Sequence, residues 1–202
     1  ILLTFSLGLR GALLSLTGSG LLLINLLWAC RVLIKESLLP IRHVVGASGG
    51  AIAATVVAAD ATARFTMEDY ALSFIQQRGR GFQLLRDMWD ASSPACSSQD
   101  EHAASSDIGL HIATTRCEDV ASKVFAFYHS DHASMTKGDE ASERLFQCIE
   151  ASCLIPPSFH PLDVVSSPSP YPDHVGTPID DPIDGMQFYI DGGIATPAPM
   201  LE

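Results

Sequence analysis

The chain has 202 residues, 47% of them hydrophobic and 17% charged, which is typical of one globular domain with a single core. The formal net charge of −11 excludes nucleic acid as a partner, because phosphate recognition requires a basic face. The five cysteines form no C-x-x-C pair, so neither a metal site nor a disulfide framework is expected. We predict one domain over residues 1–202, with no metal or cofactor. Because the sequence begins at Ile1 rather than Met, we expect it to be processed or a fragment of a longer chain.

The first sixty residues alternate between strand and helix patterns. Residues 1–5 are an apolar run typical of a buried strand, and residues 12–34 are nearly continuous apolar sequence. That second run predicts a helix buried against a sheet, with a membrane span as the alternative. The glycines and polar residues inside the run favour the buried helix.

Residues 43–45 predict a second strand, and residues 51–59 predict a helix of small side chains. Strand, turn and helix, twice in succession, indicate the α/β class. The remaining elements are expected as helices at 66–88 and 140–153, strands at 108–114, 124–128 and 188–190, and loops at 91–107 and 161–185. Thr66 is the expected N-cap of the first of these helices.

Between the second strand and its helix, Gly46-Ala47-Ser48-Gly49-Gly50 matches the G-x-S-x-G pattern. At a strand-to-helix turn this pattern forms a nucleophile elbow, in which Gly46, Gly49 and Gly50 relieve crowding around Ser48. The helix N-terminus also favours a developing anion. Ser48 is therefore the candidate nucleophile.

A serine hydroxyl needs a base to accept its proton, and two arrangements compete. One is a triad that combines Asp131 or Asp139 with His160 or His174, in the order used by α/β-hydrolases. The other is a dyad with Asp191, which follows the predicted strand at 188–190 and precedes Gly192 and Gly193. No histidine follows Asp191, and the strand-end position favours the dyad. Four other histidines are expected to be ordinary polar residues: His102, His111, His129 and His132.

A third segment, residues 6–11, is predicted to be a turn between the first strand and the apolar helix. Its backbone N–H groups can be directed at the same oxyanion as those of the elbow, which stabilises the tetrahedral intermediate of acyl transfer.

The order of these motifs resembles that of the patatin-like phospholipase family. The resemblance rests on a Gly-containing loop that ends in Arg10-Gly11, the elbow at 46–50, the segment Ala151–Pro161 and Asp191-Gly192-Gly193 with the residues that follow. It runs from about residue 3 to about residue 199. It implies a three-layer α/β/α fold with a central, mostly parallel sheet.

The resemblance also implies a lipid acyl hydrolase of the phospholipase A, lysophospholipase or triacylglycerol lipase type. Ser48 would attack the ester and form an acyl-enzyme, with Asp191 accepting the proton. The oxyanion hole would be formed by Gly8, Leu9, Arg10 and Gly11. The implied partners are a lipid ester and a peripheral membrane or lipid-droplet surface, in an intracellular, cytoplasmic or membrane-associated setting.

One departure from the family pattern supports an alternative function. Ser6 and Leu7 stand where the family usually has glycines. If the backbone at Leu7 requires a positive φ, a leucine is disfavoured there. The alternative is a catalytically impaired patatin-like protein that binds lipid or a partner.

Overall fold

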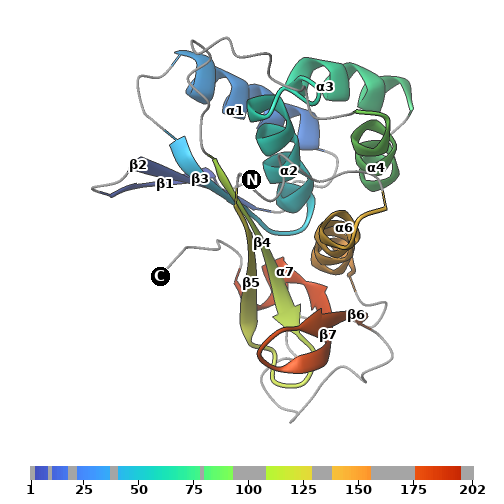
Figure 1. The fold of residues 1–202 in the computed structure, drawn as a ribbon. Coiled ribbons are helices and arrows are strands. Elements are labelled where there is room, and N and C mark those ends of the chain that lie inside the picture. The colour runs from blue at the N-terminus through green and yellow to red at the C-terminus, as the bar shows by residue number, and fades with distance from the viewer. Residues whose placement is uncertain are drawn as a thin grey trace.

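The computed structural model describes residues 3–8, 11–17, 22–36, 41–77, 80–92, 108–128, 138–155 and 176–196. Its centre is a mixed seven-stranded sheet with helices packed against it (Figure 1). The strands are β1 (Leu3–Gly8), β2 (Gly11–Leu16), β3 (Ile41–Gly46), β4 (Gly109–Arg116), β5 (Ser122–Phe127), β6 (Thr177–Asp181) and β7 (Gly185–Asp191).

The centre of the sheet is parallel, because β2, β3 and β4 run in one direction. Antiparallel pairings flank this centre: β1 pairs with β2, β5 pairs with β4, and the β6–β7 hairpin joins the far end of β4. The strands of the parallel centre have buried side chains on both faces, as expected where a sheet is covered on both sides.

Strands β3 and β7 share one edge of β4. The first half of β4 pairs with β3, and the last pair of residues is Gly46 and Ile112. The second half of β4 pairs with β7, beginning with Thr114 opposite Asp191. Strand β5 pairs with both halves and so occupies the other edge. Because β3 is parallel and β7 antiparallel to β4, their carboxyl ends point toward each other. The topology thus brings the residues after Gly46 next to Asp191.

The helices are α1 (Leu23–Glu36), α2 (Gly49–Ala61), α3 (Met67–Gln76), α4 (Gly81–Ala91), α6 (Glu140–Cys153) and α7 (Gly192–Ala195). Helices α2 and α6 pack side by side on the sheet, and α1, α3 and α4 pack around α2 (Figure 1). The short α7 lies against the opposite face, where Ala195 N–H donates to Thr115 Oγ1 (3.1 Å). Helices therefore flank both faces, and the predicted α/β/α class is confirmed.

The main hydrophobic core lies between the sheet and helices α2 and α6. Leu14, Val44 and Leu110 from the three central strands contribute to it. Helix α2 supplies small residues, and ten of its thirteen positions are buried, which permits the close approach of helix and sheet. The core thereby fixes the start of α2, the element that follows Ser48.

The N-terminal prediction was wrong in one respect. Residues 11–16 form the strand β2 rather than the start of a helix, and β1 and β2 make a hairpin in which Gly8 pairs with Gly11. Helix α1 begins only at Leu23. Residues 12–16 are buried on both faces of the sheet, so they lack the alternation that identifies a strand. None of the described helices is long and apolar enough to cross a membrane.

Most later elements agree with the sequence predictions. Thr66 caps α3 through a reciprocal capping box with Asp69, and α6 has the predicted bounds. The single helix expected at 66–88 is instead two helices, since α3 ends at Gln76 and α4 begins at Gly81. Strand β6 occupies part of the loop expected at 161–185. The loop expected at 91–107 lies almost entirely outside the described residues.

Candidate active site

Ser48 occupies a strained turn between β3 and α2. Its backbone has φ 57° and ψ −132°, a conformation that side chains with a Cβ strongly disfavour. Ala47 N–H donates to the Leu16 carbonyl (3.0 Å), which ties the turn to the end of β2. The Ser48 side chain makes no capping hydrogen bond to α2, so its hydroxyl is not used to stabilise the helix.

Close packing explains two glycines of the G-x-S-x-G motif. A Cβ at Gly46 would lie 2.2 Å from the carbonyl oxygen of Gly50, and a Cβ at Gly50 would lie 2.2 Å from the carbonyl oxygen of Leu16. Both neighbours are backbone atoms that a side chain cannot displace cheaply. Glycine at these positions therefore lets the strand and the helix approach closely enough to form the elbow.

Gly49 supplies a backbone donor beside Ser48. The N–H groups of Gly50 and Ala51 donate to the carbonyls of Ala47 and Ser48, at 2.9 and 2.8 Å. The Gly49 N–H has no hydrogen-bond acceptor among the described residues. An unused N–H in the first turn of a 13-residue helix is suited to bind a developing oxyanion.

Asp191 is held rigidly at the end of β7. Its N–H donates to the Leu154 carbonyl (3.0 Å), and its carbonyl accepts from Thr115 Oγ1 (2.8 Å). One carboxylate oxygen, Oδ1, accepts from the Gly193 N–H (2.7 Å), so Asp191 caps α7. A Cβ at Gly192 would lie 2.0 Å from the Ala113 carbonyl oxygen, so the turn after Asp191 requires a glycine.

The second carboxylate oxygen of Asp191, Oδ2, is buried and accepts no hydrogen bond of ordinary length from the described residues. Burial raises the pKa of Asp191, and the neighbouring Ser48 hydroxyl and Gly193 N–H oppose that rise in part. Ser48 lies close enough to influence the Asp191 carboxyl, although no hydrogen bond of ordinary geometry joins the two side chains. Hydrogen bonds between candidate catalytic groups are often long or poorly aligned before substrate binds. A desolvated carboxylate with a raised pKa is a stronger base than a solvated one.

The histidine alternatives receive no support from the described residues. Asp139 caps α6 by accepting from Ser142 N–H (2.6 Å), and Asp131, His160 and His174 lie outside the described residues, as do His102, His129 and His132. His111 pairs with His43, with 3.1 Å between Nδ1 of His43 and Nε2 of His111. Burial and then the neighbouring His43 lower the pKa of His111 to about 4. The structure thus brings together Ser48 and Asp191.

The predicted oxyanion loop was placed at the wrong end of the sheet. Gly8 and Gly11 pair at the tip of the β1–β2 hairpin, while Leu16, five residues further along β2, is the residue beside the elbow. At about 3.3 Å per residue, Gly11 is roughly 16 Å from that end. Leu9 and Arg10 lie outside the described residues. The segment that leaves the sheet beside Ser48 instead begins at Thr17.

Ser152 and Cys153 are site residues to which the sequence assigned no role. Both lie at the end of α6 and contact the backbone of Ser48. Their segment contributed to the family resemblance, but a contact between residues about a hundred positions apart leaves no local signal. Among the described residues, no group of three or more His, Cys, Asp or Glu side chains is placed to hold a metal ion.

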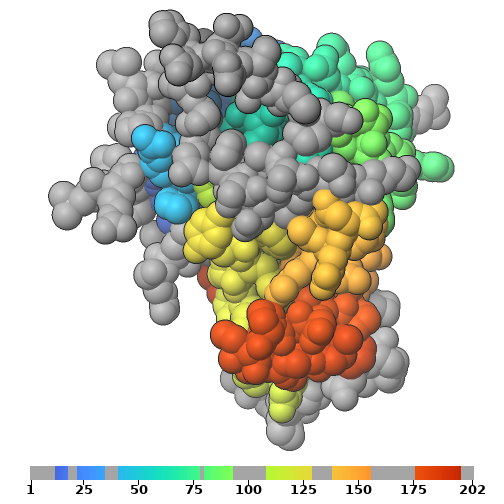
Figure 2. Space-filling view, viewed as in Figure 1, coloured from blue at the N-terminus to red at the C-terminus, as the bar shows by residue number. Residues whose placement is uncertain are grey.

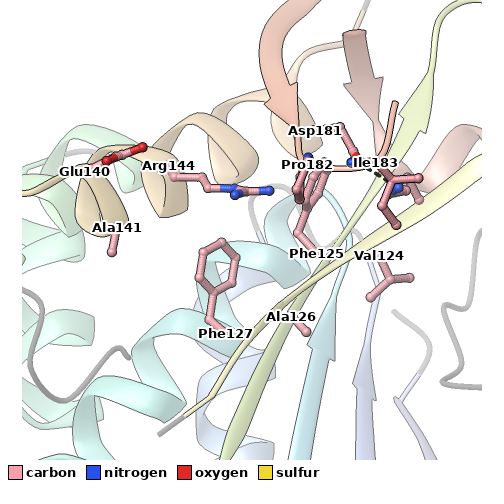
Figure 3. Close-up of a pocket in the computed structure, with 11 residues that line it drawn as sticks. Val124, Phe125, Ala126, Phe127, Glu140, Ala141, Arg144, Asp181, Pro182 and Ile183 are labelled. Carbon is pink, nitrogen blue, oxygen red and sulfur yellow. Dashed lines mark hydrogen bonds and ion pairs between the residues drawn. The ribbon is translucent and has the colours of Figure 1, made fainter. Parts of the chain in front are cut away.

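A pocket of about 590 Å³ lies away from this site, between β5, the first half of α6 and the β6–β7 turn. Figure 2 shows these three elements side by side on the surface, in yellow, orange and red. Phe125 and Phe127 line the pocket, and Arg144 extends across it toward the β6–β7 turn (Figure 3). Neither Ser48 nor Asp191 lines it.

An α/β sheet that presents a serine on a strained strand-to-helix turn beside a buried carboxylate is characteristic of hydrolases with a nucleophile elbow. The chain belongs to the patatin-like phospholipase family, whose model matches residues 14–202. This family consists of lipid acyl hydrolases and acts on lipid substrates. The match begins within β2, so Gly8, Leu9, Arg10 and Gly11 all precede it. A comparison with curated proteins found no match.

Proposed function

We propose that the protein hydrolyses carboxylic esters of lipids with a catalytic dyad of Ser48 and Asp191. The observation that carries this proposal is the juxtaposition of a strained serine and a buried carboxylate whose Oδ2 lacks an ordinary hydrogen bond. A strained backbone conformation is retained at a functional site when the surroundings over-determine it.

In the proposed mechanism the Ser48 hydroxyl attacks the ester carbonyl and Asp191 accepts its proton directly. The negative charge that develops on the carbonyl oxygen is stabilised by the Gly49 N–H and the N-terminus of α2. Collapse of the tetrahedral intermediate expels the alcohol, which takes the proton from Asp191 and leaves an acyl group on Ser48. Asp191 then accepts a proton from water as the water attacks the acyl-enzyme. Collapse of the second tetrahedral intermediate releases the fatty acid, and the Ser48 oxygen takes the proton back from Asp191, which restores both groups.

A second oxyanion donor is expected from the chain that follows Thr17. The sequence there reads Gly18-Ser19-Gly20, which lies outside the described residues. It follows the end of β2 that contacts the elbow through the Leu16 carbonyl. This segment replaces residues 8–11 as the one to test for oxyanion binding.

The catalytically impaired alternative loses the feature that favoured it. Ser6 and Leu7 lie in β1, where they pair with Leu13 and Ala12. Leu7 is not among the described residues with a positive φ. The two residues therefore impose no strain on a loop beside Ser48.

The described surface also supports action at a lipid interface. Helices α1 and α3, which contact each other, expose four large apolar side chains: Trp28, Val32, Leu72 and Ile75. Leu22, directly before α1, is exposed as well. With a net charge of −11, the protein is expected to prefer neutral or zwitterionic lipid over anionic lipid. Flotation with phosphatidylcholine vesicles tests this, and a Trp28→Ser/Ile75→Ser double variant should float less than the wild type.

Release of fatty acid from phosphatidylcholine and triacylglycerol emulsions tests the proposed activity. Ser48→Ala should abolish turnover, and Asp191→Asn should lower kcat by about 10²–10⁴-fold, the usual contribution of a general base. Ser122→Ala and Asp180→Asn change the same residue types at exposed strand positions and should retain wild-type rates. A wild-type rate in either Ser48→Ala or Asp191→Asn would contradict the dyad.

A further inference from the structure

The end of helix α6 contacts the backbone of both proposed dyad residues. Ser152 Oγ accepts from the Ser48 N–H (2.9 Å), and Cys153 Sγ contacts the Ser48 carbonyl oxygen (3.2 Å). The next carbonyl, that of Leu154, accepts from the Asp191 N–H (3.0 Å). Three consecutive residues thus bind the peptide groups of two residues that lie 143 positions apart in the sequence.

Ser152 is itself fixed in orientation. Its hydroxyl is fully buried and donates to the Ala113 carbonyl of β4 (2.6 Å). A hydroxyl has one proton, and that of Ser152 is directed at the Ala113 carbonyl, so a lone pair of the Ser152 oxygen accepts from the Ser48 N–H. The side chain therefore links α6, the sheet and the elbow.

Cys153 is suited to donate rather than to react. Burial raises the pKa of its thiol to about 12, and the nearby Asp191 acts in the same direction. The protonated thiol can donate to the Ser48 carbonyl, and a thiol that stays protonated does not compete with Ser48 as a nucleophile.

These contacts act on the one residue of the site whose backbone is strained. Residues with a Cβ rarely adopt the Ser48 conformation, which persists only where neighbouring groups hold it. Side chains from α6 bind the peptide groups on both sides of Ser48, and the Leu154 carbonyl binds the peptide before Asp191. Movement of α6 would therefore change both the elbow and its spacing to the carboxylate.

From this arrangement we infer that Ser152 and Cys153 are positioning residues, which hold the Ser48 peptide in its strained conformation and set its approach to Asp191. The inference rests on the proposed function, because the spacing matters only if Ser48 and Asp191 react together. A positional error of about 1 Å in the reacting groups can reduce an enzyme's rate on the order of 10²-fold.

The test compares kcat and KM for a soluble acyl ester in Ser152→Ala, Cys153→Ala and Cys153→Ser, each measured below its unfolding temperature. We expect Ser152→Ala to lower kcat about 10–100-fold with KM within twofold of the wild type. Cys153→Ala should lower kcat by a smaller factor, and Cys153→Ser, which keeps a donor, should restore most of it. Ser142→Ala, a buried serine in the same helix without a contact to the dyad, is the matched control.

Equal kcat in the wild type and Ser152→Ala would overturn the inference while leaving the proposed function intact. Equal losses in Cys153→Ala and Cys153→Ser, or a loss in Ser142→Ala as large as that in Ser152→Ala, would also overturn it. If Ser152→Ala does not fold, the two Cys153 variants decide the question. A folded wild type without esterase activity would overturn the proposed function, and this inference with it.

Discussion

Replacing Ser48 by glycine and by alanine measures the strain in the elbow. Both variants remove the hydroxyl, so any effect of its loss cancels when the two are compared. Alanine keeps the Cβ that disfavours φ 57° and ψ −132°, whereas glycine does not. Relief of about 1–3 kcal/mol of strain, less about 0.5–1 kcal/mol for the added freedom of glycine in the unfolded chain, predicts that Ser48→Gly is more stable by about 1 kcal/mol.

The assay is equilibrium unfolding in urea, followed by circular dichroism, with the difference taken between the two variants. Arg80 provides a matched control, since it is also an N-cap without a side-chain capping bond but has an ordinary φ of −79°. At Arg80 the difference between glycine and alanine contains the general N-cap preference for glycine and its greater freedom in the unfolded chain, but no relief of strain. A Ser48→Gly variant that is no more stable than Ser48→Ala, once the Arg80 difference is subtracted, would refute the claim that the elbow is strained.

Three further predictions concern pH and packing. Asp191 must be ionised to accept a proton, and burial raises its pKa above the 3.8 of an ordinary aspartate. We therefore expect kcat/KM to fall as the pH falls through this raised pKa. A pH profile of kcat/KM that is flat down to pH 4 would contradict this prediction. The pKa of His111 is about 4 in the folded protein and about 6.5 in the unfolded chain, so between these pH values only the unfolded chain binds the proton. The free energy of unfolding should therefore decrease by up to about 3 kcal/mol as the pH falls from about 6.5 to 4. Urea titrations at both pH values measure this, and His111→Gln should flatten the dependence. Gly192→Ala places a Cβ 2.0 Å from the Ala113 carbonyl oxygen and should lower the free energy of unfolding by at least about 2 kcal/mol. An unchanged midpoint of urea unfolding would contradict the close packing of this turn against β4.

The sequence predicted the positions of Ser48 and Asp191 because each is marked locally. A β-rich run leads into Gly46-Ala47-Ser48, and another leads into Asp191-Gly192-Gly193. The structure adds the reason that they meet, namely that β3 and β7 pair with the same edge of β4 from opposite directions. That reason depends on long-range pairing, which no local pattern specifies.

In the N-terminal segment the sequence pattern did not distinguish a buried strand from a buried helix. Residues 12–16 are apolar at nearly every position because β2 is buried on both faces. A continuous apolar run of this kind is typical of both a buried strand and a buried helix. Assigning this run to a helix moved the expected oxyanion loop to residues 6–11. The start of the family match at residue 14 agrees with β2 as the first strand of the matched region.

Two other errors have local physical causes. Gly79 and Gly81 interrupt the helical pattern after Gln76, and the structure has a new helix beginning at Gly81. Strand β6 contains Pro178, which is tolerated because β6 pairs only with β7 and so lies at the edge of the described sheet. Proline and aspartate gave this edge strand the composition of a loop.

Labelling with a fluorophosphonate probe, followed by peptide mapping, tests the central claim most directly. The probe phosphonylates an activated serine without requiring knowledge of the lipid substrate. We predict one adduct on the wild-type protein, located on Ser48, with no labelling of Ser48→Ala and much slower labelling of Asp191→Asn. Folded wild-type protein that remains unlabelled, or an adduct that persists in Ser48→Ala, would contradict the assignment of Ser48 as the nucleophile.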